Sequence, residues 1–211
     1  MRRVIQILFV LVIIVLGYLI VESIMEPIRF NQEVEVREQA TIDRLIDIRE
    51  AQKAYKDIYK QYTSSFDTLI SFVDTGNFIV VRAIGDIPED WLDELGFDKA
   101  RERALNEGVI SRENTLVPVL DSLFDADYPT DSLRYVPFTV GITFEMTSGE
   151  LLTSSNLTVQ VVEAYCLYDD LLNGMDPQLV VNYKDERMKI VGFEGVKFGS
   201  MEEGTLTGNW E

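Results

Sequence analysis

Near its amino terminus the chain has an apolar run, residues 4–21, in which only Gln6, Gly17 and Tyr18 depart from strongly apolar character. As a helix these eighteen residues would be ~27 Å long, close to the ~30 Å thickness of bilayer hydrocarbon. We therefore expect residues 1–26 to be a transmembrane anchor. The residues expected to contact lipid are Val4, Ile7, Phe9, Val10, Ile13, Ile14, Tyr18 and Val21.

The flanks of this run bear on its cleavage and its orientation. The run is longer than the ~7–15 apolar residues of a typical signal peptide, and no small-x-small cleavage site follows it. We therefore expect an uncleaved anchor rather than a cleaved signal peptide. Arg2 and Arg3 precede the run, whereas Glu22 and Glu26 follow it. Because positive charge favours the cytoplasmic side, we expect a cytoplasmic amino terminus and a domain on the other side of the membrane.

A long amphipathic helix is predicted in the segment that follows, residues 27–62. Pro27 is expected to bend or break the helix that leaves the membrane, and Asn31 to cap a new one. Residues 33–62 lack Gly and Pro and carry apolar side chains at helical spacing. We expect this stripe to pack on the chain's own domain; the alternative is a coiled coil, which Gln52 disfavours by interrupting the seam. The expected core residues are Leu45, Ile48, Tyr55, Tyr59 and Tyr62.

Short elements are predicted in residues 63–132. Glycines divide this segment, because Gly76 and Gly108 each follow a helical pattern and can end it. The predicted elements are a helix at 66–75, a buried strand at 78–81, and helices at 88–95 and 98–106.

The same segment is strongly acidic. Residues 86–131 hold thirteen acidic and four basic residues. Asp90, Asp93 and Glu94 are the side chains that we expect to face a protein partner. The alternative is a solvated helix start, where the helix dipole favours negative charge.

Residues 133–200 show a β pattern and are expected to belong to the same domain. The predictions are strands at 134–139, 142–146, 157–164, 179–183 and 188–191, a turn at 147–149 and a hairpin turn at 184–187. Residues 201–211 are expected to form a polar tail in which Trp210 is isolated. The predicted fold class is therefore α+β: a transmembrane helix, then a long amphipathic helix packed on a mostly antiparallel β-sheet.

Charge and composition exclude several functions. The formal net charge of −17 repels polyanions, so nucleic acid is not an expected partner. Histidine is absent, which removes histidine-based triads and most catalytic zinc sites. Cys166 is the only cysteine, so no intramolecular disulfide can form. We expect no catalytic residues and no cofactor; a hydrolase that uses paired carboxylates is a remote alternative.

One loop could bind calcium. Asp169, Asp170 and Asp176 lie close together in the sequence with Asn173 and Gly174, and oxygen-rich loops that contain glycine can hold Ca²⁺. The alternative is a plain acidic turn, because the loop lacks the spacing of an EF-hand and a correctly placed bidentate Glu.

Two neighbouring stretches, LIDIREAQKAY at residues 45–55 and YKQYTSSFDTL at residues 59–69, resemble the pilin-like module of type II secretion pseudopilins. The resemblance implies a membrane helix that runs into a long helix, a tyrosine-rich turn and a small β-sheet packed on that helix. It does not extend to a prepilin peptidase site, because residues 2–10 contain no Gly followed by Phe. The whole chain, through residues 208–211, also resembles single-pass membrane proteins of the Bacteroidota, which implies a Gram-negative inner membrane and a periplasmic domain.

These observations lead to two hypotheses of function. The first is a non-enzymatic, membrane-anchored, pilin-like scaffold or assembly subunit of a secretion or cell-envelope complex. Its partners would be the lipid bilayer, through one transmembrane helix, and other proteins of a membrane complex. The alternative is a periplasmic binding module for calcium or a basic peptide.

Overall fold

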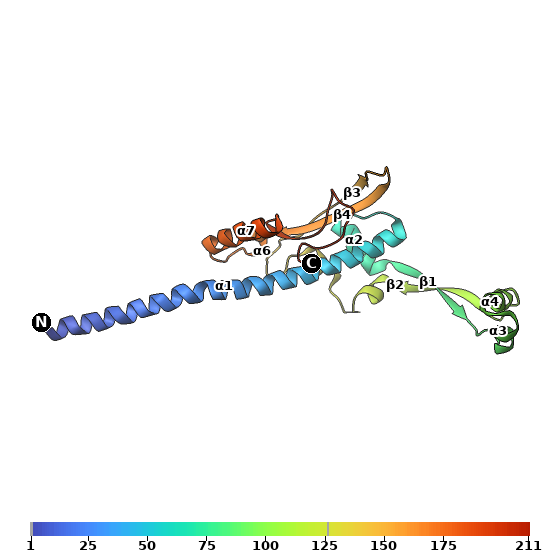
Figure 1. Ribbon diagram of the computed structural model, residues 1–211, viewed down its shortest axis with the longest axis horizontal. Helices are drawn as coiled ribbons and strands as arrows, with labels where there is room; N and C mark the ends of the chain where they lie inside the picture. The colour runs from blue at the N-terminus through green and yellow to red at the C-terminus, as the bar shows by residue number, and fades with distance from the viewer. Residues whose placement is uncertain (1, 126) are drawn as a thin grey trace. The chain divides into compact units, whose positions relative to one another are not determined.

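The computed structural model describes residues 2–125 and 127–211, and it leaves out the side chains of residues 2, 4, 81–84 and 111–113. The chain is α+β and divides into two compact units (Figure 1). The first unit combines Met1–Phe66 with Asp131–Glu211, and the second is Asp67–Thr130. The first unit thus joins the predicted segments 27–62 and 133–200, and the second covers most of the predicted segment 63–132.

A single helix of 58 residues, α1 (Arg2–Tyr59), belongs to the first unit. The predicted break at Pro27 and the predicted cap at Asn31 are both wrong, because Pro27 lies inside the continuous helix. A proline deprives the carbonyl four residues before it of a hydrogen bond. That carbonyl belongs to Ser23, which is exposed, so water or lipid headgroups can satisfy it. An ion pair of 2.9 Å between Glu22 and Arg29 spans the proline on the helix surface.

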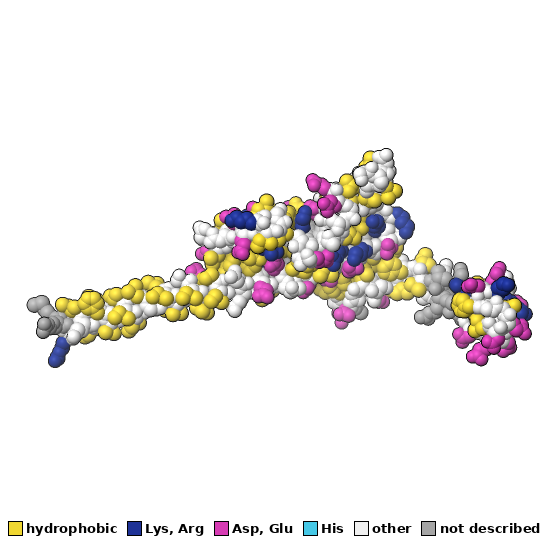
Figure 2. All heavy atoms as spheres, viewed as in Figure 1, with side chains coloured by type: hydrophobic (Ala, Val, Ile, Leu, Met, Phe, Trp, Pro, Cys, Tyr) yellow, Lys and Arg dark blue, Asp and Glu magenta, His cyan; other side chains and the backbone are white. Residues whose placement is uncertain are grey.

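The two ends of α1 differ in burial. At its amino-terminal end the apolar side chains are exposed, and none of its most apolar eighteen-residue window is buried in the protein (Figure 2). Burial begins at Phe30 and Val34 and continues through Leu45 and Ile48. Helix α1 is therefore long and apolar enough to cross a membrane at one end, and it belongs to a folded core at the other.

An antiparallel sheet of three strands contributes to that core. It consists of β3 (Glu145–Leu152), β4 (Thr158–Leu167) and β5 (Gly195–Gly199), in the order β3-β4-β5, and β5 contacts α1. At the end of β5, Gly199 has a positive φ of 77°, and a Cβ there would lie 2.0 Å from the carbonyl oxygen of Val162. Only glycine fits this close approach of two strands.

Strand predictions for residues 133–164 are correct in part. The strand at 157–164 is confirmed as β4, whereas the strand at 142–146 begins only at Glu145. The turn at 147–149 is wrong, because these residues lie inside β3, where Gly149 pairs with Val161. The strand at 134–139 is also wrong. A 3₁₀ helix, η1 (Thr130–Arg134), precedes a turn that contains Pro137, and a proline cannot donate to a strand ladder.

The predicted hairpin at 179–191 is wrong as well, because these residues form helix α7 (Pro177–Val191), which follows the short helix α6 (Tyr168–Leu171). Asp176 caps α7 by accepting hydrogen bonds from the backbone N–H groups of Gln178 (2.9 Å) and Leu179 (3.0 Å). Pro177 at the first position and Gly192 after the last, with φ 74°, complete a set of helix boundary signals. These signals outweigh the β-branched residues between them.

The carboxyl-terminal residues 201–211 contact the rest of the first unit. The Asn209 side chain accepts a hydrogen bond from the Lys197 backbone N–H (3.1 Å) and donates one to the Gly195 carbonyl oxygen (2.9 Å). The guanidinium of Arg49 lies 6.0 Å from the centre of the Trp210 ring, so the prediction of an isolated Trp210 is wrong.

The second unit is a hairpin with helices at both ends. Its elements are α2 (Phe66–Thr75), β1 (Asn77–Ile84), α3 (Glu89–Leu95), α4 (Phe97–Asn106), β2 (Ser111–Pro118) and α5 (Val119–Leu123). The three predicted helices and the strand at 78–81 are confirmed, while β2 and α5 were not predicted. The prediction that this strand is buried is wrong for Ile79, whose side chain is 67% exposed. The reason is that β1 belongs to a sheet of only two described strands, β1 and β2. The side chain of Val81 lies outside the described residues.

Candidate functional site

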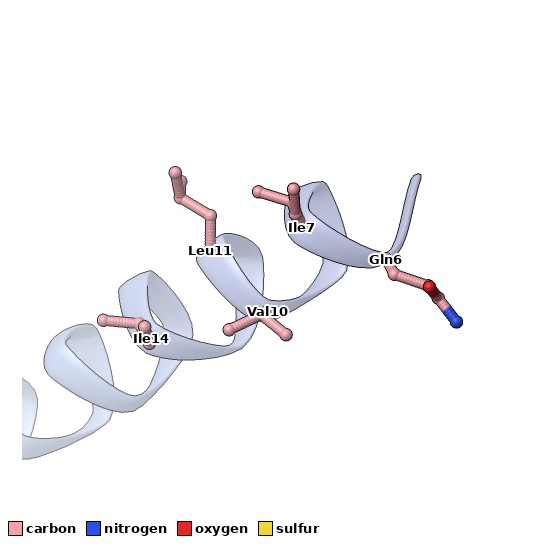
Figure 3. A pocket seen from close by; sticks show the side chains of 5 residues that line it. All are labelled: Gln6, Ile7, Val10, Leu11 and Ile14. Carbon is pink, nitrogen blue, oxygen red and sulfur yellow. The ribbon is translucent and has the colours of Figure 1, made fainter. Parts of the chain in front are cut away.

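The predicted lipid-contacting residues lie on the exposed end of α1. Ile7, Phe9, Val10, Ile13, Ile14, Tyr18 and Val21 are all exposed, and the side chain of Val4 lies outside the described residues. A shallow depression of about 380 Å³ is lined by Gln6, Ile7, Val10, Leu11 and Ile14, whose side chains are drawn in Figure 3. All five side chains belong to one helix, so the depression has a floor and no opposing wall. It suits acyl chains packed along a helix and cannot enclose a soluble ligand.

Four of the five predicted core residues are buried, three on α1 and one just after it. Leu45 and Ile48 are fully buried, and Tyr55 and Tyr62 are nearly so. Tyr59 is 54% exposed, so its placement in the core is wrong. It is the last residue of α1, and its ring lies 4.5 Å from that of Tyr55, on the outside of the core.

A polar cluster that was not predicted joins α1 to α6 and α7, which lie beside it (Figure 1). At its centre is the carboxylate of Glu38. The hydroxyls of Tyr168 and Tyr183 donate to its two oxygens, at 2.5 and 3.0 Å. Arg187 donates from Nη2 to Glu38 Oε1 (3.3 Å) and from Nε to the hydroxyl oxygen of Tyr168 (3.0 Å). The edge of the Tyr183 ring also packs against Phe30, with the ring centres 6.2 Å apart.

The environment of this cluster keeps both tyrosines neutral. Burial, the charge of Glu38 and the hydrogen bond to it raise the pKa of Tyr183 to about 12. Burial and the hydrogen bond to Glu38 raise the pKa of Tyr168 further above its usual value. Neutral phenols serve as hydrogen-bond donors, and both oxygens of Glu38 already accept bonds. The cluster therefore fastens α7 to α1.

Two of the three predicted calcium ligands make other side-chain interactions. Asp176 caps α7, and Asp169 accepts a hydrogen bond from Lys184 Nζ at 2.5 Å. Asp170 lies on α6, where its carbonyl accepts from the backbone N–H of Asn173 at 3.4 Å. Among the described residues, no group of three or more His, Cys, Asp or Glu side chains is arranged to hold a metal ion.

The single cysteine is not a reactive group. Cys166 is buried in β4, and burial, with a smaller contribution from the charge of Asp170, raises the pKa of its thiol to about 12. The reactive form of a cysteine is the thiolate, which is scarce at neutral pH in such a site.

The predicted partner-facing residues lie at the tip of the second unit. Asp90, Asp93 and Glu94 are exposed on α3, which follows β1 at the end of the hairpin distant from α5 (Figure 1). Next to them is a cleft of about 490 Å³ that was not predicted. It is lined by Gly85, Asp86, Ile87, Leu92, Phe97, Arg101 and Ile110.

Local sequence patterns give little indication of the polar cluster around Glu38 or of the cleft at the tip of the second unit. Glu38 and Tyr168 are 130 positions apart, and no periodic pattern links them. Tyr183 and Arg187 are four positions apart, which places them on one face of helix α7, but the sequence pattern of residues 179–191 predicts a hairpin instead. Comparisons of the chain with protein families, with characterised proteins and with solved structures find no match.

Proposed function

We propose that this chain is a non-enzymatic, single-pass membrane scaffold, an assembly subunit of a secretion or cell-envelope complex. In this proposal α1 crosses the inner membrane with its amino terminus in the cytoplasm, and both units lie in the periplasm. The single observation that carries the proposal is the continuity of α1, from an exposed apolar segment of membrane-spanning length into the buried core at Leu45 and Ile48. A continuous helix couples the position of a folded domain to that of its anchor.

The order of elements supports the pilin-like part of this proposal. A helix that emerges from an apolar segment ends beside Tyr59 and Tyr62, and an antiparallel sheet contacts it through β5. The same order is what the resemblance to pseudopilins implies.

The chemistry of the polar side chains supports a structural role over a catalytic one. Glu38 accepts hydrogen bonds on both carboxylate oxygens, and Tyr168 and Tyr183 are neutral donors to it. Asp169 and Asp176 are engaged with Lys184 and with the start of α7. These groups hold elements of the first unit together.

Labelling and crosslinking in native membranes test the proposal. A cysteine placed at the exposed Ser155, in the turn between β3 and β4, should react with a membrane-impermeant maleimide added to intact spheroplasts, whereas a cysteine at Arg3 should react only after lysis. A photocrosslinking residue at Asp93 should give a discrete protein adduct. Labelling of Arg3→Cys from outside would overturn the orientation. Absence of an adduct both from Asp93 and from exposed positions of the first unit would overturn the scaffold.

A further inference from the structure

The tip of the second unit carries a cleft that is lined mostly by apolar side chains. Four apolar side chains contribute to its lining: Ile87, Leu92, Phe97 and Ile110. Its volume of about 490 Å³ lies within the ~300–1,000 Å³ of typical ligand pockets and exceeds that of a single large side chain. Phe97 is 63% exposed, so one wall of the cleft presents an aromatic face to solvent.

The backbone at the base of the cleft fixes its shape. Gly85 has a φ of 99°, and a Cβ there would lie 2.2 Å from the carbonyl oxygen of Val109. Only glycine fits at this position, because the residue after β1 passes very close to the residues just before β2, among them the lining residue Ile110. On the other side, the Ile110 backbone N–H donates to the Ala104 carbonyl oxygen at 3.1 Å, which ties the end of α4 to the start of β2.

Charge selects what could occupy this cleft. Residues 67–130 contain fourteen acidic and five basic residues, a net charge of −9 within the −17 of the whole chain. Of the five, Arg103 is paired with Glu107 at 2.8 Å and its guanidinium lies 4.3 Å from the centre of the Trp91 ring, whereas Arg101 lines the cleft together with Asp86. The attraction for a cation therefore comes from the carboxylates around the cleft and not from its lining. Nucleic acid, an anionic membrane surface and a second copy of this unit are all repelled by such a field. A positively charged polypeptide is attracted, and its apolar side chains match the lining.

We infer that the tip of the second unit binds a basic segment of a partner protein. One apolar side chain of that segment occupies the cleft against Phe97 and Leu92. Lys or Arg residues on either side of it lie over the carboxylates of Asp90, Asp93 and Glu94. This inference rests on the proposed scaffold function, and it specifies the chemistry of the partner that the scaffold holds.

Selection from a random peptide library tests the inference without knowledge of the partner. The full chain, in nanodiscs of zwitterionic lipid, is panned against displayed random twelve-residue peptides. The same library is panned in parallel against the Phe97→Ser variant. Peptides enriched on the wild type should contain at least two Lys or Arg residues and one large apolar residue, and replacing that apolar residue by Ser should weaken binding at least tenfold. Their affinity should fall as salt rises from 50 to 300 mM, since exposed charges are then screened over ~6–14 Å.

Matched variants distinguish peptide binding in the cleft from nonspecific peptide binding elsewhere on the surface. Phe97→Ser should weaken binding of an enriched peptide about tenfold, whereas Leu116→Ser, which changes a 64% exposed side chain near the other end of the hairpin, should not. Neutralising Asp90, Asp93 and Glu94 should weaken binding and flatten the salt dependence. The same charge change at Asp121, Asp125 and Asp127, which lie in or after α5, should do neither.

Several outcomes would overturn the inference. They are enrichment of acidic or purely polar peptides, equal binding by the wild type and Phe97→Ser, and absence of any enrichment over that variant. If one of these occurs while crosslinking still yields a protein adduct from another surface, the scaffold proposal stands and only the site at the tip is lost. If the peptides bind as expected but no adduct forms in native membranes, the tip is a binding site and the scaffold proposal is lost.

Discussion

The side-chain amide of Gln52 forms two hydrogen bonds with the backbone of Thr63: Nε2 donates to the carbonyl oxygen at 2.6 Å, and the Thr63 N–H donates to Oε1 at 3.2 Å. Gln52 is fully buried in α1, so these bonds replace the water that the amide loses on folding. Because α1 ends at Tyr59, the two bonds hold the returning chain against the helix and place Tyr62 in the core. The residue that interrupts the apolar stripe thus fixes the reversal of the chain.

Replacing this amide should destabilise the first unit. Gln52→Ala leaves the N–H and carbonyl of Thr63 without their partners in a partly buried site, and we expect a loss of about 1–3 kcal/mol from the free energy of unfolding. Gln39→Ala is the matched control, since Gln39 is an exposed glutamine of the same helix that bonds only to Asp43 among the described residues. Its effect should stay below about 0.5 kcal/mol. Urea unfolding of the full chain in detergent, followed by near-UV circular dichroism, measures both, and equal midpoints would contradict the role of Gln52.

The polar cluster predicts a loss of stability at alkaline pH. Burial and the neighbouring Glu38 raise the pKa of Tyr183 to about 12 in the folded chain, whereas the unfolded chain has the ordinary value of about 10. A phenol whose pKa is raised by folding binds its proton more tightly in the folded state, so its contribution is complete below pH 10 and disappears as the pH rises towards 12. The melting temperature should therefore fall between pH 10 and 12.

Tyr183→Phe provides the control for this effect. The variant lacks the hydroxyl that donates to Glu38, so it should melt at a lower temperature than the wild type at pH 8. It should also show a shallower alkaline decline, because one of the groups that titrates is gone. Tyr168, Tyr165 and Lys184, whose pKa values are also raised by folding, contribute to the decline that remains. A decline as steep as that of the wild type would remove Tyr183 as a cause.

Continuity of α1 through Pro27 predicts a distance. Tyr18 and Glu35 are seventeen positions apart on the helix, which corresponds to about 25 Å along an unbroken axis. Spin labels at Tyr18→Cys and Glu35→Cys, in a Cys166→Ser background in nanodiscs, should give one narrow distance distribution near this value. Pro27→Ala should leave the distribution unchanged. A shorter mean distance for the wild type that lengthens in Pro27→Ala would show that the proline bends the helix.

The sequence was informative where local signals and final structure agree. An apolar run of membrane-spanning length, the helix at 66–75 ended by Gly76 and the acidic helix after Pro88 all depend on neighbouring residues, and all are present. Helix α7 has local signals too, the cap at Asp176, Pro177 and Gly192, but the β-branched Val180 and Val181 between them favour a strand. The cluster around Glu38 could not be predicted, since its members are brought together only by folding of segments 130 or more positions apart.

The role of Asp176 gives a prediction that separates a helix cap from a calcium ligand. Its carboxylate accepts hydrogen bonds from the backbone N–H groups of Gln178 and Leu179, so Asp176→Ala should cost about 1 kcal/mol of stability. Asp176→Asn should retain most of that stability, because asparagine caps helices almost as well as aspartate. A calcium ligand would behave differently, since loss of its charge would matter as much as loss of its oxygens.

Calcium itself completes this test. Binding to the folded state alone would raise the melting temperature by mass action, and 1 mM Ca²⁺ would do so for any site with a dissociation constant well below that concentration. We expect no such rise, because Asp169 is paired with Lys184 and Asp176 is committed to the start of α7. The measurement is calorimetry of the wild type and of Asp176→Asn with 1 mM Ca²⁺ and with chelator. A rise of several degrees in the wild type that is absent in Asp176→Asn would contradict the capping role and restore the calcium loop as a binding site.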